Sequence, residues 1–335
     1  MVVDVAPIAL PIAFPPIALS PSSTLSDGQS AQPLASRNGA HRRCTLSHES
    51  GSESRRMTPV IDWDDAFANM AHVEGSAALP ETWAERAAAY RQALPADRLE
   101  TDVAYGDGPR QRLDLVWPDG PVRGLAVFVH GGYWMRLTKS HWTDLAEGAR
   151  AQGWAVCFPG YTLAPEARIH EITAEIGRAI GAAAARVEGP VHLAGHSAGG
   201  HLVTRMLCDD TPLAGEVLGR VRRAVSISGL HDLRPLLRTR MNETLRLDAA
   251  EAASESAALR GPADAVPLTC WVGGGERPEF IRQAELMASM WYGLDVPTRC
   301  HVDGTHDHFT VIDGLGDAHA PIVEAFVGTD EGEDR

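Results

Sequence analysis

The order of sequence patterns predicts an α/β fold, in which a mostly parallel sheet of eight strands is covered by helices on both faces. Two observations lead to this prediction. From about residue 62 onward, short strand-like runs alternate with longer amphipathic segments that are typical of helices. The run at residues 124–130 is continuously apolar up to its last residue, His130, as expected of a strand that is buried on both of its faces.

Each expected element follows from its own local pattern. The alanine-rich segment 81–94 is amphipathic and predicts a helix, while the alternating segments 101–106 and 111–117 flank turn residues and predict a hairpin. Only the second of the eight strands is expected to run antiparallel. Further strands are expected at residues 124–130, 154–160, 190–195, 222–229, 266–274 and 296–304. Further helices are expected around residues 139–152, 171–187, 198–208, 279–293 and 320–327.

One domain, residues 57–329, is expected between two terminal segments. Residues 1–56 begin with an apolar run whose prolines argue against a membrane helix. No basic residue precedes this run, so it is also a poor secretory signal. The rest of this segment has no periodicity, and we predict disorder, with Met57 a candidate for the true start. Residues 330–335 form an acidic tail. The helical segment 230–265 interrupts the alternation and predicts a small cap over the site.

Charge and cysteine content exclude several classes of function. The 44 acidic and 30 basic residues give a net charge of −14, which argues against nucleic acid and anionic membranes as partners. The five cysteines are widely spaced and form no C-x-x-C pair, so they indicate neither a zinc site nor a disulfide framework. We therefore expect a cytoplasmic protein that acts on a small-molecule substrate. The possibility of a homodimer stays open.

A glycine-flanked serine is the first candidate for chemistry. Residues 195–199 read Gly-His-Ser-Ala-Gly, with Ser197 between a predicted buried strand and a predicted helix. This is the context of a nucleophile elbow, in which the glycines avoid collisions and the serine hydroxyl is lifted above the sheet. The backbone N–H of Ala198, at the start of the helix, would point toward an anion beside the serine. The alternative for an isolated match is a tight turn.

Such a serine needs a base and a third group that orients the base. In this architecture the acid follows the next-to-last strand, where Glu276 and Glu279 lie. We prefer Glu276 because it directly follows the strand, whereas Glu279 suits the first turn of the next helix. The histidine follows the last strand. His301 falls within that strand, and of the remaining two, His306 and His308, we prefer His308.

Two further features have competing interpretations. The His-Asp-His sequence at residues 306–308 would also fit a solvated loop, or a metal pair that includes Asp307, although no further ligand motif accompanies it. The sequence His-Gly-Gly-Tyr-Trp at residues 130–134 follows the third strand, where a loop that donates to an oxyanion is expected. A plain turn after the strand is the alternative.

These motifs resemble those of the α/β-hydrolase superfamily, and within it the kynurenine formamidase (arylformamidase) group, which is related to the hormone-sensitive-lipase-like esterases. The resemblance extends from about residue 62 to 327. It is carried by HGGYW, GYTLAP, GHSAGGHL, SGLHDLRPL, ERPEF and HDHF. It implies an α/β-hydrolase fold and a Ser197–Glu276–His308 triad without cofactor or metal, although the formamidase pattern usually has aspartate where this chain has Glu276. The implied oxyanion donors are Ala198 and Gly132, together with Gly131 or Tyr133.

The resemblance also implies a reaction, the hydrolysis of N-formylkynurenine to kynurenine and formate in tryptophan catabolism, through a formyl-serine. Tyr133 and Trp134 would form an aromatic wall of the substrate pocket, with core packing as the alternative for Trp134. An arginine that holds the substrate carboxylate would favour this substrate, and the candidates are Arg136, Arg234, Arg238 and Arg240. The alternative functions are a carboxylesterase for short-chain esters and a ligand-binding relative without turnover.

Overall fold

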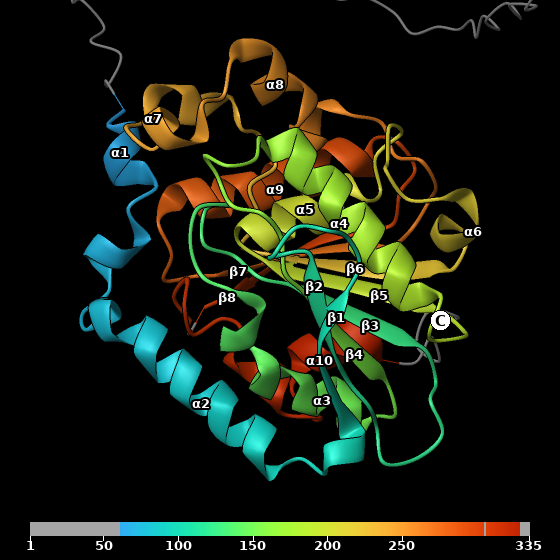
Figure 1. The fold of residues 1–335 in the computed structure, drawn as a ribbon. Helices are drawn as coiled ribbons and strands as arrows, with labels where there is room; N and C mark the ends of the chain where they lie inside the picture. Colours follow the sequence, from blue (N-terminus) through green and yellow to red (C-terminus); the bar gives the residue numbers. More distant parts are fainter. Residues whose placement is uncertain (1–60, 305, 329–335) are drawn as a thin grey trace, which may run out of the picture. The chain divides into compact units, whose positions relative to one another are not determined.

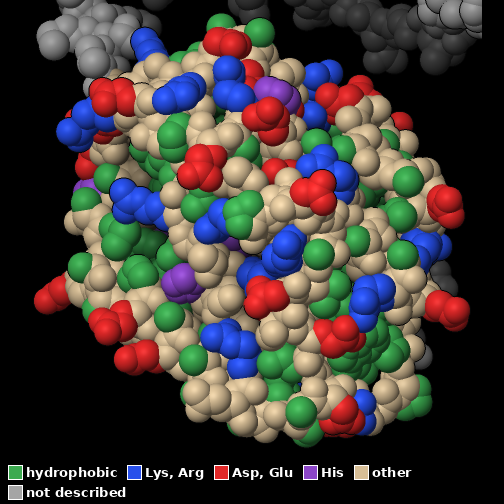
Figure 2. Space-filling view, in the orientation of Figure 1, with side chains coloured by type: hydrophobic (Ala, Val, Ile, Leu, Met, Phe, Trp, Pro, Cys, Tyr) green, Lys and Arg blue, Asp and Glu red, His purple; other side chains and the backbone are tan. Residues whose placement is uncertain are grey.

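The computed structural model describes residues 61–304 and 306–328 of the chain (Figure 1). The predictions made for residues 1–56 and 330–335, and for Met57 as the start, lie outside these residues. Within the described part, none of the helices combines the length and the hydropathy that crossing a membrane requires. Acidic and basic side chains are interspersed over the face that Figure 2 shows.

An eight-stranded sheet forms the centre of the fold, in the order β1-β2-β4-β3-β5-β6-β7-β8. Strand β2 pairs antiparallel with both β1 and β4, and every other pairing is parallel. The prediction of eight strands with only the second antiparallel is therefore confirmed. The strands are β1 Leu99–Ala104, β2 Arg112–Val116, β3 Leu125–Val129, β4 Ala155–Pro159, β5 Val191–His196, β6 Val221–Ile227, β7 Leu268–Gly273 and β8 Thr298–Asp303.

Helices cover both faces of the sheet, which explains why the central strands are apolar throughout. In β3, Leu125, Val127 and Val129 belong to one buried cluster, while Ala126 and Phe128 belong to the cluster on the opposite face. Figure 1 shows α4, α5 and α9 on one side of the sheet, and α3 and α10 on the other. These helices are α3 Glu147–Ala151, α4 Ile169–Ala184, α5 Ala198–Arg205, α9 Pro278–Tyr292 and α10 Pro321–Val327.

The helix predicted around residues 139–152 is wrong over most of its length. The structure has two 3₁₀ turns there, η4 (Lys139–His141) and η5 (Thr143–Ala146), before the short α3 begins. The backbone leaves the helical conformation at Trp142, with φ −130° and ψ 5°. Two inward side chains account for the break, because Trp142 is 1% exposed in the core and the Lys139 ammonium lies 2.6 Å from the buried carboxylate of Asp114.

The first described segment contains more structure than the sequence indicated. Before α2 (Leu79–Ala93) come α1 (Trp63–Ala66) and two 3₁₀ turns, η1 (Asn69–His72) and η2 (Ser76–Ala78). We refer to residues 61–83 as the N-terminal wall. Two ion pairs hold its beginning, Asp64 with Arg240 at 2.9 Å and Asp65 with Arg277.

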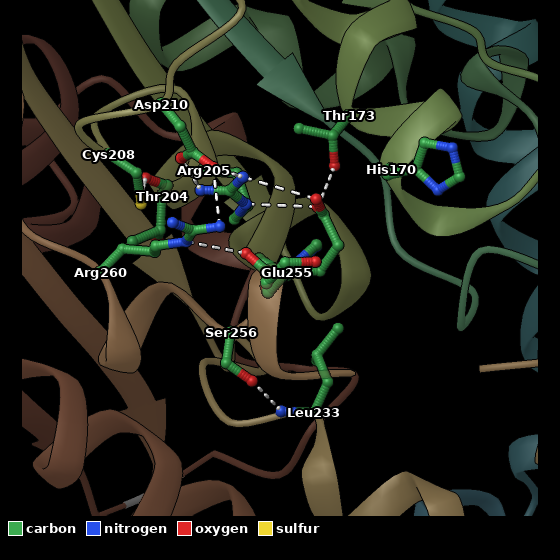
Figure 3. A network of polar contacts seen from close by, with 12 residues as sticks. His170, Thr173, Thr204, Arg205, Cys208, Asp210, Leu233, Glu255, Ser256 and Arg260 are labelled. Atoms are coloured by element: carbon green, nitrogen blue, oxygen red, sulfur yellow. Dashed lines mark hydrogen bonds and ion pairs between the residues drawn. The ribbon is translucent and has the colours of Figure 1, made fainter. Parts of the chain in front are cut away.

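The segment 230–265 is helical, as predicted, and contains η6 (Arg234–Arg238), α7 (Asn242–Leu245), α8 (Ala249–Ser254) and η7 (Ala257–Leu259). A buried carboxylate fastens it to the rest of the fold (Figure 3). Glu255, 4% exposed, accepts hydrogen bonds from the Thr173 hydroxyl of α4 at 2.7 Å and from Arg205 Nε of α5 at 3.2 Å. Arg205 is itself 3% exposed and also binds Asp210. The cap is therefore joined directly to α5, the helix that begins at the candidate site.

Candidate active site

Ser197 stands in a sharp turn between β5 and α5. Its backbone has φ 55° and ψ −116°, a conformation that costs free energy for a residue with a side chain. Glycines allow this turn, because a Cβ on Gly195 would lie 2.2 Å from the Gly199 carbonyl oxygen. A Cβ on Gly199 would lie 1.9 Å from the carbonyl oxygen of Val129 in β3. The predicted context of strand, elbow and helix is thus present.

Glu276 and His308 meet at the carboxyl end of the sheet. Glu276 follows β7 and its side chain is fully buried, and His308 lies in the loop after β8 with its side chain 5% exposed. The His308 Nδ1–H donates to Glu276 Oε2 at 2.6 Å. A histidine held in this way carries its proton on Nδ1, which leaves Nε2 able to accept one.

The second oxygen of Glu276 is also occupied. Oε1 accepts a hydrogen bond from the Ser228 hydroxyl at 2.5 Å and another from the Gly273 backbone N–H at 2.8 Å. Three donors therefore surround one buried side chain and fix its orientation toward His308. Sequence reasoning quoted Ser228, which directly follows β6, only as the first residue of the motif SGLHDLRPL and missed its contact with Glu276.

His196, beside the serine, supports the loop of His308. Its Nε2–H donates to the His308 carbonyl oxygen at 2.8 Å, and the two rings lie 4.7 Å apart. Burial, followed by the charge of nearby His308, lowers the pKa of His196 well below its usual value, so His196 is neutral at physiological pH. As a neutral donor, His196 holds the loop of His308 in place and adds no positive charge beside it.

The other predicted candidates have different partners. Glu279 lies in the first turn of α9 and bonds to Arg282 at 2.7 Å and to Gln283 at 2.8 Å. The His301 ring packs against Trp271, with ring centroids 3.8 Å apart. His306 lies 3.7 Å from Asp303. Among the described residues, no group of three or more His, Cys, Asp or Glu side chains has the arrangement of a metal site.

The loop after β3 runs directly beside the serine. A Cβ on Gly131 would lie 2.9 Å from the Ser197 Cβ, so only a glycine lets this backbone approach so closely. The next residues, Gly132 and Tyr133, have φ +108° and 52°. Within the described chain, no hydrogen bond uses the backbone N–H of Gly132, Tyr133 or Ala198 as donor. These N–H groups are thus available to an anion, as at other helix starts and turns of this kind.

Ser197 and His308 line the same cavity, whose volume is about 390 Å³ and therefore suited to a small ligand. The N-terminal wall supplies much of the lining, whereas the cap supplies Met241. The prediction placed the cap over the site and did not foresee the N-terminal wall there. Most of the lining is apolar, and its largest apolar side chains are Phe67, Met70, Trp83, Met135, Leu137, Trp142, Met241 and Phe309.

The two aromatic residues predicted to form the pocket wall have separate positions. Tyr133 lines the cavity, and its hydroxyl donates to the Phe67 carbonyl oxygen at 2.6 Å, which ties the loop to the N-terminal wall. Trp134 has no exposed surface and packs edge-on against His201 with ring centroids 5.1 Å apart. The prediction of Trp134 in the pocket is wrong, because its side chain turns into the core beneath the loop.

One of the four candidate arginines lines the cavity. Arg136 is exposed there, and its side chain forms no hydrogen bond or ion pair with the rest of the described chain. Arg234 pairs with Asp232 and Arg240 with Asp64, and neither they nor Arg238 contribute to the lining.

Comparison with known proteins finds one matching family model and several curated kynurenine formamidases. A family model described as alpha/beta hydrolase family matches residues 126–335. The kynurenine formamidase of Danio rerio is 29% identical over 272 residues, which cover 78% of this chain and 88% of the relative. That of Salmo salar is 31% identical over 242 residues, 65% of this chain and 78% of the relative.

Solved structures include two informative neighbours. A protein from Silicibacter sp., provisionally named a thioesterase, is 46% identical, with a TM-score of 0.75 over 80% of this chain and 99% of its own. Esterase B from Lactobacillus rhamnosis is 19% identical, with a TM-score of 0.56 over 77% of this chain and 91% of its own. At that identity, the second neighbour demonstrates a shared fold alone.

Proposed function

The chain belongs to the alpha/beta hydrolase family and is a hydrolase that resembles the kynurenine formamidases, and from this premise we propose that it cleaves N-formylkynurenine with Ser197 as nucleophile. One observation carries the proposal. Ser197 and His308 line one cavity of ligand size at the carboxyl end of the sheet, and His308 is bonded from behind to the buried Glu276.

The first half of the reaction transfers the formyl group to the serine. The Ser197 hydroxyl oxygen attacks the formyl carbon while His308 Nε2 takes the hydroxyl proton. Glu276 stabilises the imidazolium through the Nδ1–H bond of 2.6 Å. The oxyanion accepts hydrogen bonds from the N–H groups of Ala198, Gly132 and Tyr133. His308 then gives its proton to the aniline nitrogen as the carbon–nitrogen bond breaks, and kynurenine leaves.

The second half releases the acid and restores the enzyme. Water attacks the formyl-serine carbon and gives a proton to His308 Nε2. The tetrahedral intermediate collapses, formic acid leaves, and the Ser197 oxygen takes the proton back from His308. Formic acid then loses its proton to solvent and becomes formate, and no cofactor is needed.

Two features of the lining support an aromatic amino acid as substrate. Phe67, Trp83 and Phe309 offer ring faces and edges for stacking with an aryl group. Arg136 offers a guanidinium without an ionic partner in the described chain, and a carboxylate is the group that such a side chain binds best. N-formylkynurenine carries both an aryl ring and a carboxylate.

The test is turnover of N-formylkynurenine and of p-nitrophenyl acetate by the purified protein, with Ser197→Ala beside it. We expect kcat/KM for the formamide to exceed that for the ester, and Ser197→Ala to remove both activities. Fast ester cleavage with negligible formamide cleavage would support the second candidate, a carboxylesterase for short-chain esters, which the apolar lining favours. Tight binding of N-formylkynurenine by an inactive wild-type protein would indicate a ligand-binding relative instead.

A further inference from the structure

Asn69 is a buried amide that has no hydrogen-bond partner in the part of the chain that the structure describes. It begins η1 in the N-terminal wall, lines the cavity, and is 5% exposed. Neither Nδ2 nor Oδ1 forms a hydrogen bond within the described residues. No other described Asn or Gln side chain is buried with both of its polar groups unpaired.

Such an arrangement costs free energy, because a buried amide loses its hydrogen bonds to water and here gains none in return. The local backbone does not need this side chain, since η1 is held by backbone hydrogen bonds such as Ala71 N–H to the Ala68 carbonyl oxygen. Its neighbours in the lining, Phe67 and Met70, are apolar, so an apolar residue would suit the apoprotein better. The amide is therefore explained by a partner that enters the cavity.

We infer that Asn69 is a substrate-binding residue, whose carboxamide donates one hydrogen bond to the substrate and accepts another from it. This inference rests on the proposed function and narrows its substrate class. The substrate is an acyl compound that carries, beyond the bond to be cleaved, a hydrogen-bond acceptor and a hydrogen-bond donor. The ketone and the ammonium of N-formylkynurenine are such groups, whereas a simple alkyl ester has neither.

Asn69 and Arg136 divide the polar recognition between two elements. Asn69 supplies the amide of the cavity lining and Arg136 supplies its guanidinium. The other titratable or hydroxyl-bearing side chains of the lining are His196, Ser197, His308 and Tyr133. Tyr133 is already bonded to Phe67. Recognition of the polar part of the substrate thus comes from the N-terminal wall and the loop after β3. The loop after β7, which carries Glu276, takes no part in it.

The experiment compares Asn69→Leu and Asn69→Ala with the wild type on N-formylkynurenine and on p-nitrophenyl acetate. Loss of the two hydrogen bonds should raise KM for N-formylkynurenine about 10-fold or more in both variants. The kinetic constants for p-nitrophenyl acetate should stay within about 2-fold, because that ester has no hydrogen-bond donor and, beyond the bond to be cleaved, only the weakly accepting nitro group. The Leu variant adds bulk and the Ala variant does not, so equal effects identify the amide as the cause. A similar loss on both substrates, or no loss on either, would overturn the inference.

Asn242 provides a matched structural control. Its amide is fully used within the protein, accepting from the Leu247 N–H at 2.8 Å and donating to the Leu247 carbonyl oxygen at 3.1 Å. Asn242→Leu should lower Tm and leave the ratio of the two activities unchanged. Asn69→Leu should leave Tm unchanged or raise it, because an unpaired buried amide is replaced by an apolar group. A fall in Tm as large as that of Asn242→Leu would assign Asn69 a structural role and refute ours.

Failure of this inference is distinguishable from failure of the proposed function. In a Ser197→Ala background, calorimetry measures N-formylkynurenine binding without turnover, and adding Asn69→Leu should weaken it about 10-fold. If the wild type neither binds nor cleaves N-formylkynurenine, the proposed function fails. The role of Asn69 is then decided with p-nitrophenyl esters whose acyl part does or does not contain an amide. Equal selectivity of wild type and Asn69→Leu on that pair would overturn the role of Asn69 as well.

Discussion

Replacing Glu276 by glutamine tests the proposed triad without changing the size of the side chain. In the wild type, Oε1 faces two N–H or O–H donors, from Gly273 and Ser228, and Oε2 faces His308. A glutamine has one oxygen and one NH₂ group, so it must choose which of them faces the two donors.

The surroundings decide this choice. With the amide oxygen toward Ser228 and Gly273, both of these hydrogen bonds are kept. In the opposite orientation the NH₂ group would face the Gly273 N–H, and the unpaired donors would cost about 1–3 kcal/mol. The first orientation is therefore favoured, and it directs the glutamine NH₂ toward His308 Nδ1.

A donor at this position reverses the histidine tautomer. His308 Nδ1 must then accept, so the proton moves to Nε2, which can no longer take the proton of Ser197. Loss of the correct tautomer in a triad lowers kcat by about 10⁴-fold. We expect a loss of about 10³- to 10⁴-fold for Glu276→Gln, with Tm changed little because all three contacts of the side chain persist.

The assay is kcat with p-nitrophenyl acetate and with N-formylkynurenine, so that it does not depend on which substrate is physiological. Glu279→Gln is the matched control, because Glu279 is a nearby buried carboxylate in the first turn of α9 that bonds to Arg282 and Gln283 instead. It should keep kcat within about 2-fold. If Glu276→Gln retained more than a tenth of wild-type kcat in a folded protein, the assigned role of Glu276 would be refuted.

Three further predictions concern charged and titratable side chains. Arg136→Gln should raise KM for N-formylkynurenine about 10-fold and leave p-nitrophenyl acetate unaffected, with Arg238→Gln as the inert control; equal effects of the two variants would contradict this. Glu255→Gln should lower the free energy of unfolding by about 1–3 kcal/mol in urea titrations, because Arg205 loses a buried charged partner but keeps Asp210; an unchanged value would mean that the cap is not fastened there. Burial lowers the pKa of His130 and His231 to about 3 and that of His201 to about 4, so the unfolded chain binds protons below pH 6.5 that the folded chain does not. The free energy of unfolding should therefore fall from about pH 6.5 toward pH 4 by up to about 1.4 kcal/mol per pH unit for each histidine. Urea titrations at about pH 7 and about pH 5 measure this fall, and a free energy of unfolding that is no lower at pH 5 would contradict the prediction.

The parts of the site that could be predicted are those set by chain order. A parallel sheet brings the carboxyl ends of its strands to one edge, so Ser197, Glu276 and His308 could be selected by the strand that each one follows. The glycines of the elbow were predictable for a similar reason, since their steric role lies within a few residues of Ser197 and in the adjacent strand.

Other features depend on tertiary contacts that leave no local pattern. Ser228 acquires its contact only when the ends of β6 and β7 are neighbours, and a serine after a strand is common elsewhere. Trp134 and Trp142 are both buried, yet only Trp142 also lines the cavity, and nothing in the local sequence distinguishes the two. Asn69 lies in a turn that was not predicted, because four-residue 3₁₀ turns have too few residues to establish a period.

The N-terminal wall makes the cavity a composite of two parts that differ in how firmly they are held. The sheet edge is fixed by backbone contacts as close as that of Gly199 against Val129, whereas the wall is fastened partly by ion pairs such as that of Arg240, which is 84% exposed. Exposed pairs contribute little to stability and tolerate replacement. The two buried rings of the wall, Phe67 and Trp83, belong to the core clusters on either side of the sheet and must be kept. Substitutions elsewhere in the wall that reach the cavity, as at Met70, are therefore the ones expected to alter substrate choice at little cost in stability.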